Sequence, residues 1–273
     1  MLYYRVSLDV PVQLMIKVST LLRKHREELG TRNGTRALTC WQQAKFILAW
    51  FRDKPDLRRL GQGFGISQAT VYRYKDEGTE VLKAKAPSLH EALERAVEQG
   101  LPYLILDGTL ISADRCSDKK TSRKGAQIDK WYSGKAHEHA GLIQGLIAPS
   151  GVPLWLSGVL PGSTHDITAA RELVLPGLRP YLGEIPCLAD SGYEGAGAGV
   201  HVPVKKPRKG DLDVNAKTRN ILLRGTRYQG ERGFAILKER WAALRNVTVD
   251  PSQIGDIVKA ALVLTLFEYK RLT

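Results

Sequence analysis

The stretch Leu101-Pro-Tyr-Leu-Ile-Leu-Asp107 decides the fold of the second part of this chain. Its short, continuous apolar run stops at a carboxylate, which is the pattern of a buried β-strand. A second apolar run, from Ile185 to Ala189, stops in the same way at Asp190. We therefore expect two buried strands, each with an aspartate at its end, at the edge of one sheet.

Two further apolar runs lie between these strands, at residues 142–148 and 152–160. The turn sequence Pro149-Ser-Gly151 joins them and predicts an antiparallel hairpin. The segment Pro161-Gly-Ser-Thr-His-Asp166 then opens a helix that we expect to run through Leu173. This order of strands and helices indicates an α+β or mixed α/β domain, in which helices flank a mixed sheet.

Asp107 and Asp190 are predicted ligands of divalent cations. Two carboxylates held close together on rigid elements repel one another unless cations lie between them. Oxygen ligands without His or Cys favour Mg²⁺ or Mn²⁺. Two such ions, roughly 3.5–4 Å apart, can activate a nucleophile on one side of a phosphorus atom and stabilise the leaving oxygen on the other.

Glu231 is the third predicted ligand, on a helix with an apolar side. Arg227 lies four residues before it and Lys238 seven residues after it, so the three side chains are expected on one face. The carboxylate could bind metal while the two cations bind phosphate oxygens. The alternative is a solvated helix with ordinary ion pairs. Because Gly230 is a poor helix former, costing about 1 kcal/mol relative to Ala, we expect the start of this helix to be loose or set by bound DNA.

Asp166 is the main rival for the middle ligand position. It lies at the expected start of a helix, where Asp is favoured simply as a cap or as a partner of the helix dipole. Its nearness to the sheet edge also allows it to bind the metal directly or to support the ligands. Both interpretations stay open from the residues alone.

The first part of the chain reads as helices, expected over residues 11–29 and 41–51. Residues 56–76 then have the layout of a helix-turn-helix, with Gly65 at the turn and Ser67 capping the second helix. An ordinary helical hairpin is the alternative. The second helix is expected to present to DNA the outward side chains of Gln68, Thr70, Arg73 and Lys75.

Charge favours a polyanionic partner. The chain has 41 Lys and Arg against 28 Asp and Glu, a formal net charge of +13, which attracts nucleic acid. A basic loop over residues 119–135 ends at Lys135 and carries Trp131 and Tyr132, so it could follow a phosphate backbone while the aromatic rings stack on an unpaired base. The alternative is a solvated loop with two packing aromatics.

Localisation is read from the cysteines and the apolar runs. Cys40, Cys116 and Cys187 are widely spaced and suggest no disulfide framework, which fits a reducing cytosol. The N-terminus lacks the order of a signal peptide. The best apolar run, residues 257–267, is too short to span a bilayer and is expected to be a core helix. We therefore expect a cytoplasmic protein without membrane contact.

The stretch Lys83-Ala-Lys-Ala-Pro87 reads as a linker between domains, because Pro87 ends one helix and Ser88 can cap the next. The predicted domains are a helical DNA-binding domain over residues 1–86 and a catalytic domain over residues 87–273.

Four motifs in order carry a family resemblance: Asp107-Gly-Thr, Pro161-Gly-Ser-Thr-His-Asp166, Ala189-Asp190-Ser-Gly-Tyr193 and Arg227-x3-Glu231-x6-Lys238. Together they resemble insertion-sequence transposases of the IS5 group, which are related to the Harbinger-type DDE nucleases. The resemblance implies an RNase H-like catalytic domain with Asp107, Asp190 and Glu231 as catalytic residues. It also implies Mg²⁺-dependent cleavage by water at the terminal inverted repeats of double-stranded DNA.

The same resemblance implies that the freed 3′-hydroxyl then attacks target DNA, and that two protomers pair two element ends as a homodimer. Two other functions remain open. One is a decayed or domesticated DNA-binding protein that keeps the scaffold without cleavage. The other is a related nuclease that cuts DNA without strand transfer.

Overall fold

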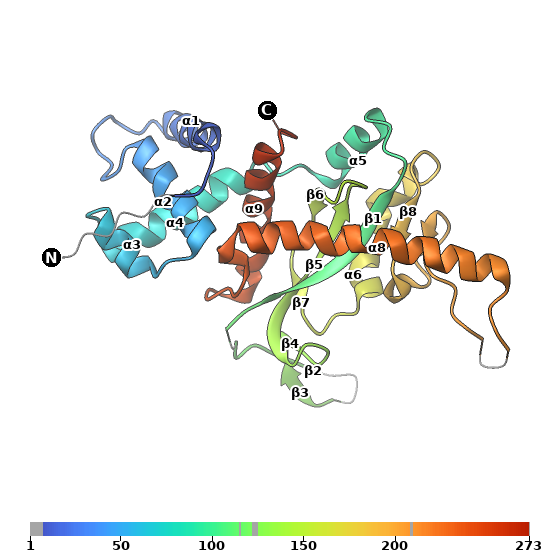
Figure 1. Ribbon diagram of the computed structural model, residues 1–273. Helices are drawn as coiled ribbons and strands as arrows, with labels where there is room; N and C mark the ends of the chain where they lie inside the picture. The colour runs from blue at the N-terminus through green and yellow to red at the C-terminus, as the bar shows by residue number, and fades with distance from the viewer. Residues whose placement is uncertain (1–7, 115, 122–124, 208–209, 273) are drawn as a thin grey trace. The chain divides into compact units, whose positions relative to one another are not determined.

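The computed structural model describes residues 8–114, 116–121, 125–207 and 210–272 (Figure 1). Within this description the side chains of Thr226 and Arg227 are left out. The described chain forms two compact units. The first comprises the residues up to 86 together with 238–245 and 259–272, and the second comprises 87–237 together with 246–258.

Helices build the first unit, and segments from both parts of the sequence contribute to it. They are α1 (Val12–Glu28), α2 (Cys40–Asp53), α3 (Leu57–Gly63), α4 (Gln68–Lys83), the end of α8 (Val214–Arg240), the 3₁₀ turn η3 (Ala242–Leu244) and most of α9 (Ile254–Glu268). The ring of Phe51 packs edge-on against Trp241 with 6.5 Å between the ring centroids. The Trp241 indole N–H donates to Thr265 Oγ1 at 2.8 Å. C-terminal residues therefore complete the core of the N-terminal helices.

Two of these helices occupy the stretch expected to be a helix-turn-helix. Gly65 has a φ of 66° between α3 and α4, and Ser67 Oγ accepts from the Thr70 backbone N–H at the start of α4. The helices cross closely, because a Cβ on Gly61 would lie 2.3 Å from Val71 Cγ2. That this helix pair binds DNA stays a prediction.

A mixed seven-stranded sheet forms the centre of the second unit. Its strands are β1 (Leu104–Ser112), β4 (Tyr132–Ser133), β5 (Glu138–Ile147), β6 (Pro153–Leu156), β7 (Leu160–Pro161), β8 (Cys187–Ala189) and β9 (Val200–His201). The order is β4-β5-β1-β8-β9, with β6 and β7 also paired to β5. Strands β1, β8 and β9 are parallel neighbours, whereas β5 runs antiparallel to β1. A separate two-stranded sheet joins β2 (Lys119–Thr121) to β3 (Gln127–Asp129).

Helices cover both faces of this sheet. Leu104 and Leu106 belong to the core shared with α5 (Leu89–Glu98), α6 (Asp166–Leu173) and α7 (Leu175–Leu178). Ile105 points to the opposite face, since side chains alternate along a strand, and there it lies against α8. Three further 3₁₀ turns complete the fold: η1 (Arg179–Tyr181), η2 (Ser191–Tyr193) and η4 (Pro251–Gln253).

Glycines let α8 lie close against strands β1 and β5, which it crosses in Figure 1. A Cβ on Gly233 would lie 2.9 Å from Ile147 Cδ1, and one on Gly145 would lie 2.9 Å from Phe234 Cζ. A Cβ on Gly230 would lie 3.1 Å from Asp107 Oδ2. The expectation of a loose helix start near Gly230 is wrong: α8 begins at Val214, and Gly230 is an interior residue where the sheet comes close.

The mixed sheet with flanking helices and the hairpin of β5 and β6 are confirmed. The core helix expected at residues 257–267 is confirmed as part of α9, most of which is buried. The expectation that Asp107 ends its strand is also wrong. β1 continues to Ser112, since β5 pairs with it along that whole length, while β8 pairs only as far as Leu106. None of the described helices has both the length and the apolar character needed to cross a bilayer.

Candidate active site

Asp107 and Asp190 lie at the place where two parallel strands stop pairing. The last paired residues of β1 and β8 are Leu106 and Ala189, and each aspartate comes directly after one of them. Both carboxylates line a small cavity with Leu223 of α8. Backbone N–H groups hold them in place: Gly108 N donates to Asp107 Oδ1 at 2.9 Å and Gly192 N donates to Asp190 Oδ1 at 2.7 Å.

Asp166, the first residue of α6, lies at the same place. A Cβ on Gly192 would lie 2.9 Å from Asp190 Oδ1 and 3.6 Å from Asp166 Oδ2. A Cβ on Gly108 would lie 2.5 Å from Asp166 Oδ1. The two glycines therefore leave the space into which the carboxylates project. The N-cap residue of α6 is His165, and Asp166 is the acidic residue in its first turn, where it can also interact with the helix dipole.

Tyr193 connects the three aspartates to the sheet. Its hydroxyl is buried and donates to Gln144 Oε1 of β5 at 2.7 Å. The pKa of Tyr193 is raised far above its ordinary value, first by burial and then by the charges of Asp166, Asp107 and Asp190. The phenol therefore stays protonated and serves as a fixed hydrogen-bond donor.

The negative charge at this place is incompletely balanced. Burial raises the pKa of Asp166, and the charge of Asp190 raises it further, whereas Lys135 and Gln144 lower it. Gln144 Nε2 lies near the carboxylate but is buried without a hydrogen bond of normal geometry within the described residues. Lys135, one of the predicted DNA contacts, is exposed. Its positive charge lies close enough to Asp166 to lower the pKa of that carboxyl.

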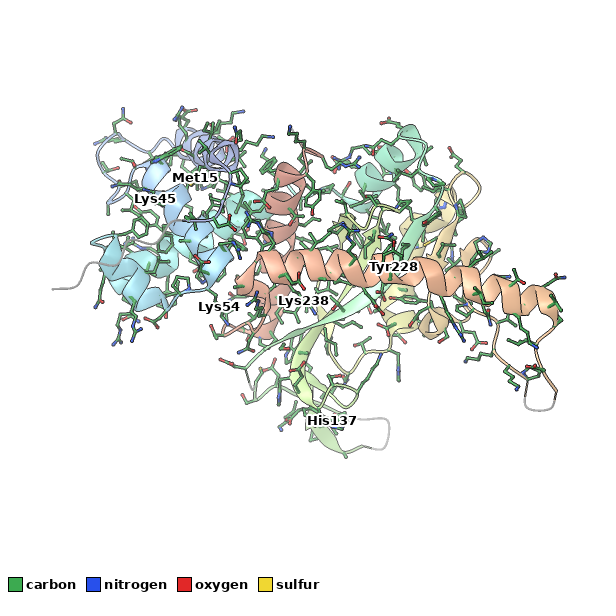
Figure 2. The ribbon with its side chains drawn as sticks, viewed as in Figure 1. Met15, Lys45, Lys54, His137, Tyr228 and Lys238 are labelled. Atoms are coloured by element: carbon green, nitrogen blue, oxygen red, sulfur yellow. The ribbon has the colours of Figure 1, made fainter. Side chains whose placement is uncertain are left out.

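Glu231 directly follows Gly230, which is the residue of α8 that lies against Asp107. Its side chain is exposed. Arg227 also belongs to α8, but its side chain lies outside the described residues. Lys238 is half-buried near the C-terminal end of the helix, and Tyr228 lies nearer the middle (Figure 2). The structure thus brings Asp107, Asp166 and Asp190 together and places Glu231 one residue from their contact with α8.

The predicted DNA contacts on α4 differ in exposure. Gln68 and Arg73 are exposed, and Arg73 donates to Thr70 Oγ1 at 3.1 Å. Lys75 is only 4% exposed, so the expectation that it points outward is wrong. Its ammonium group pairs with Asp76 at 2.6 Å and lies over the Trp50 ring, because position 75 falls on the side of α4 that packs against α2.

The basic loop also separates into buried and exposed aromatics. Trp131 is 4% exposed and donates its indole N–H to Asp118, so it packs inside the protein. Tyr132 is 38% exposed and contacts the ring of His139. Of the two rings, Tyr132 alone has a surface that a base could reach.

The donor set fits a hard divalent cation. Carboxylate oxygens of Asp107, Asp166 and Asp190 come from three elements, and the pKa of Asp166 is raised first by burial and then by the charge of Asp190. A cation would stabilise the charged form of these carboxylates. In the described part of the chain, no three His, Cys, Asp or Glu side chains already form a complete metal-binding group.

The sequence of this region matches a known family. Residues 106–265 match the family described as DDE superfamily endonuclease. The chain belongs to this family. The matched part of the chain contains Asp107, Asp166, Asp190 and Glu231.

Other comparisons add less. No curated protein matches this chain. Among solved structures it matches one titled "Mos1 transposase paired-end complex with left transposon end", with 10% sequence identity, 92% of this chain covered and 98% of that chain covered. The TM-score is 0.23, too low for the two folds to be compared residue by residue.

Two functional candidates, Tyr193 and Gln144, were missing from the predicted site residues. A signal for Gln144 exists in the sequence, since it is the one polar residue in the apolar run 142–148. A buried polar side chain needs a partner, but the sequence does not reveal that Tyr193 provides it.

Proposed function

We propose that this protein is a DNA transposase that binds the terminal inverted repeats of its element and performs metal-dependent strand cleavage and strand transfer. The observation that carries the proposal is the convergence of Asp107, Asp166 and Asp190. Gly230 of α8 lies beside Asp107 at this place. Membership of the DDE superfamily endonucleases supports DNA as the substrate. The net charge of +13 supports it too.

Asp107 and Asp190 would hold Mg²⁺ or Mn²⁺ in a two-metal site, with Glu231 completing it from α8. Such ions lower the pKa of a bound water and stabilise the developing charge at phosphorus. Asp166 would contribute a further oxygen beside Asp190. Tyr193 holds Gln144 by its hydrogen bond, and the Gln144 amide would in turn orient the Asp166 carboxylate, so we regard both as positioning residues.

Basic side chains around this centre would hold the DNA backbone. Lys135 lies near Asp166, where an ammonium group can bind a phosphate oxygen next to the reacting bond. Arg227 precedes Glu231 by four residues and Lys238 follows it by seven, spacings that would bring side chains to one side of a helix. Gln68, Thr70 and Arg73 of α4 would contact DNA in the first unit.

The finer assignments belong to this proposal as well. We assign the protein to the IS5 group, its catalytic domain to the RNase H-like fold, and its assembly to a homodimer on paired ends. The supports are the four motifs in order and the parallel β1–β8 pair that carries Asp107 and Asp190.

Reaction with the ends of its own element tests this function. The full-length protein is incubated with Mg²⁺, a duplex that ends in the element's repeat, and a supercoiled plasmid. We expect cleavage at the repeat and joining of its 3′-end to the plasmid, with no reaction on a scrambled duplex. Cleavage without joining would identify a nuclease without strand transfer. Binding without cleavage would identify a DNA-binding protein that has lost its activity.

A further inference from the structure

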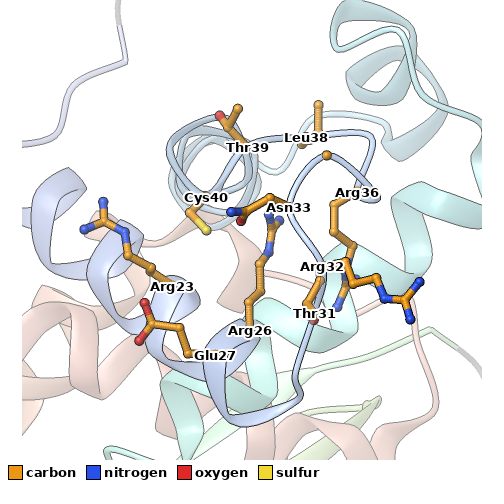
Figure 3. A pocket seen from close by; sticks show the side chains of 11 residues that line it. Arg23, Arg26, Glu27, Thr31, Arg32, Asn33, Arg36, Leu38, Thr39 and Cys40 are labelled. Carbon is orange, nitrogen blue, oxygen red and sulfur yellow. The ribbon is translucent and has the colours of Figure 1, made fainter.

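A pocket rich in arginine lies in the first unit, beside the part of α4 whose Glu77 pairs with Arg36. It has a volume of about 360 Å³ and is formed by the end of α1, the loop that follows and the start of α2 (Figure 3). The arginine pocket, as we call it, is defined by the side chains of Arg23, Arg26, Arg32 and Arg36. Glu27 and Cys40 also line it.

Two of the four arginines are fixed by the protein. Arg36 makes a two-pronged ion pair with Glu77, with distances of 3.2 and 2.8 Å. Arg26 donates to Gln43 Oε1 at 2.6 Å, and Gln43 in turn donates to Glu77 at 3.0 Å. Glu77 thus neutralises Arg36, but Arg26 is bonded to an uncharged amide. Its Nε is buried and has no hydrogen-bond partner in the described residues.

The other two arginines are available to a ligand. Arg23 and Arg32 are exposed, and neither side chain forms an ion pair or hydrogen bond within the described residues. The only carboxylate lining the described pocket is that of Glu27. Arg23, Arg26 and Arg32 therefore have no carboxylate partner, and Glu27 is the one acidic residue opposite them. The described pocket has an excess of positive charge.

The start of α2 adds to this field. Thr39 caps the helix, and Cys40 is its first residue. The N-terminal end of a helix attracts anions through its partial positive charge. Arginine presents a planar fork of donors that matches the oxygens of a phosphate group. A phosphate with its attached sugar is of a size that this cavity can accept.

We propose that the arginine pocket binds a backbone phosphate of duplex DNA and so forms a second anchor in addition to α4. This inference rests on the proposed function for the identity of the polyanion. Because it concerns binding in the first unit, it can be tested without divalent cations and separately from cleavage. A phosphate contact should act equally on all DNA sequences and should depend on salt.

The first test measures DNA affinity of the full-length protein by fluorescence anisotropy over a salt series. The double substitution Arg23→Ala/Arg32→Ala should weaken binding about tenfold and reduce the slope of log K against log salt by about one. The control Lys24→Ala/Lys45→Ala removes the same charge from exposed positions of α1 and α2 outside the pocket (Lys45 in Figure 2). It should change affinity and slope much less.

A substitution of opposite sign separates binding from structure. Glu27→Gln removes the one acidic side chain of the pocket and should tighten DNA binding, a result that damage to the fold would not produce. Equal affinity of wild type, Arg23→Ala/Arg32→Ala and Glu27→Gln would overturn the inference.

Cys40 reports occupancy directly. In a Cys116→Ser background, Cys40 is the half-buried thiol that iodoacetamide can reach, because Cys187 is fully buried and burial raises the pKa of its thiol to about 12. Duplex DNA should slow alkylation of Cys40, and this protection should be lost in Arg23→Ala/Arg32→Ala. Protection by inorganic phosphate but not by DNA would overturn the inference in favour of a small anion.

Failure of the two proposals can be told apart. Protein that binds DNA and protects Cys40 but does not cut DNA would contradict the proposed function and leave the pocket assignment standing. Protein that cuts DNA while Cys40 stays equally reactive would contradict the pocket assignment alone.

Discussion

Gly230 is an interior residue of α8 that leaves room for Asp107. A Cβ at this position would lie 3.1 Å from Asp107 Oδ2 and 3.2 Å from Ile105 Cγ2. Gly230→Ala gains helix propensity of about 1 kcal/mol, but the methyl group pushes either α8 or the carboxylate away. We therefore expect DNA cleavage to fall at least tenfold while the free energy of unfolding changes little, as measured by strand-cleavage rates and urea denaturation.

Gly225→Ala is the matched control for that substitution. Gly225 lies in the same helix, and a Cβ there would meet nothing within 4 Å. The protein should become more stable by up to about 1 kcal/mol and keep its cleavage rate. If Gly230→Ala behaved in the same way, the close approach of α8 to Asp107 would have no functional role.

Tyr193 is the second residue whose role can be isolated. Tyr193→Phe removes the hydroxyl that donates to Gln144 at 2.7 Å and leaves a buried amide oxygen without a partner. The expected loss in the free energy of unfolding is about 1–3 kcal/mol, measured by urea denaturation. Tyr228→Phe, at a position 56% exposed, should stay within about 0.5 kcal/mol of wild type. A loss of no more than about 0.5 kcal/mol for Tyr193→Phe would show that the hydrogen bond to Gln144 contributes little to the free energy of unfolding.

The helix α6 begins with Asp166, whose partly buried charge lowers the free energy of unfolding at neutral pH. Since burial raises the pKa of Asp166 above its ordinary 3.8, its contribution to stability is present at low pH and is lost as the pH rises through the raised value. Asp166→Asn should therefore be more stable than wild type at pH 7. The difference should shrink toward zero as the pH falls to 3.8, as followed by urea denaturation at each pH.

Lys135→Ala should change this pH dependence of stability in the opposite direction to Asp166→Asn. The Lys135 ammonium group lowers the pKa of Asp166, so Lys135→Ala should enlarge the loss of stability between acid and neutral pH. Adding Mg²⁺ should reduce that loss, because the cation would stabilise the charged Asp166 carboxylate in place of the Lys135 ammonium. A stability difference between Asp166→Asn and wild type that did not change with pH would contradict this account of α6.

Elements with strong local signals could be predicted from the sequence, and their partners could not. The apolar run 101–106 predicted a strand, but its continuation to Ser112 depends on pairing with β5, which no local pattern reveals. The outward placement of Lys75 failed because its side of α4 is set by packing against α2. Gly230 was interpreted as a weak point, since only the tertiary contact with Asp107 explains a glycine there.

The predicted site shows the same limit. Asp107 and Asp190 could be found because each directly follows an apolar run in the sequence. Asp166 stayed ambiguous, because a helix start explains an aspartate equally well. Its nearness to Asp190 is a property of how α6 and β8 meet in space.

For the whole molecule, the excess of positive charge predicts binding that is sensitive to salt. Arg73 is exposed on α4 and has no ionic partner in the described residues. Arg73→Ala should weaken DNA binding and lower the salt slope by about one if Arg73 contacts a phosphate. If it contacts a base, the slope stays and discrimination between sequences falls. Unchanged affinity, slope and discrimination would remove α4 from the proposed DNA interface.

The central claim is that Asp107 and Asp190 form a metal-dependent centre for cutting DNA. Asp190→Asn keeps the size of the side chain and the acceptor for Gly192 N, but removes the charge that a divalent cation needs. Cleavage of element-end DNA with Mg²⁺ or Mn²⁺ should fall at least about a hundredfold, while the dissociation constant for the same DNA stays within about twofold of wild type. Equal cleavage rates for Asp190→Asn and wild type would contradict the account.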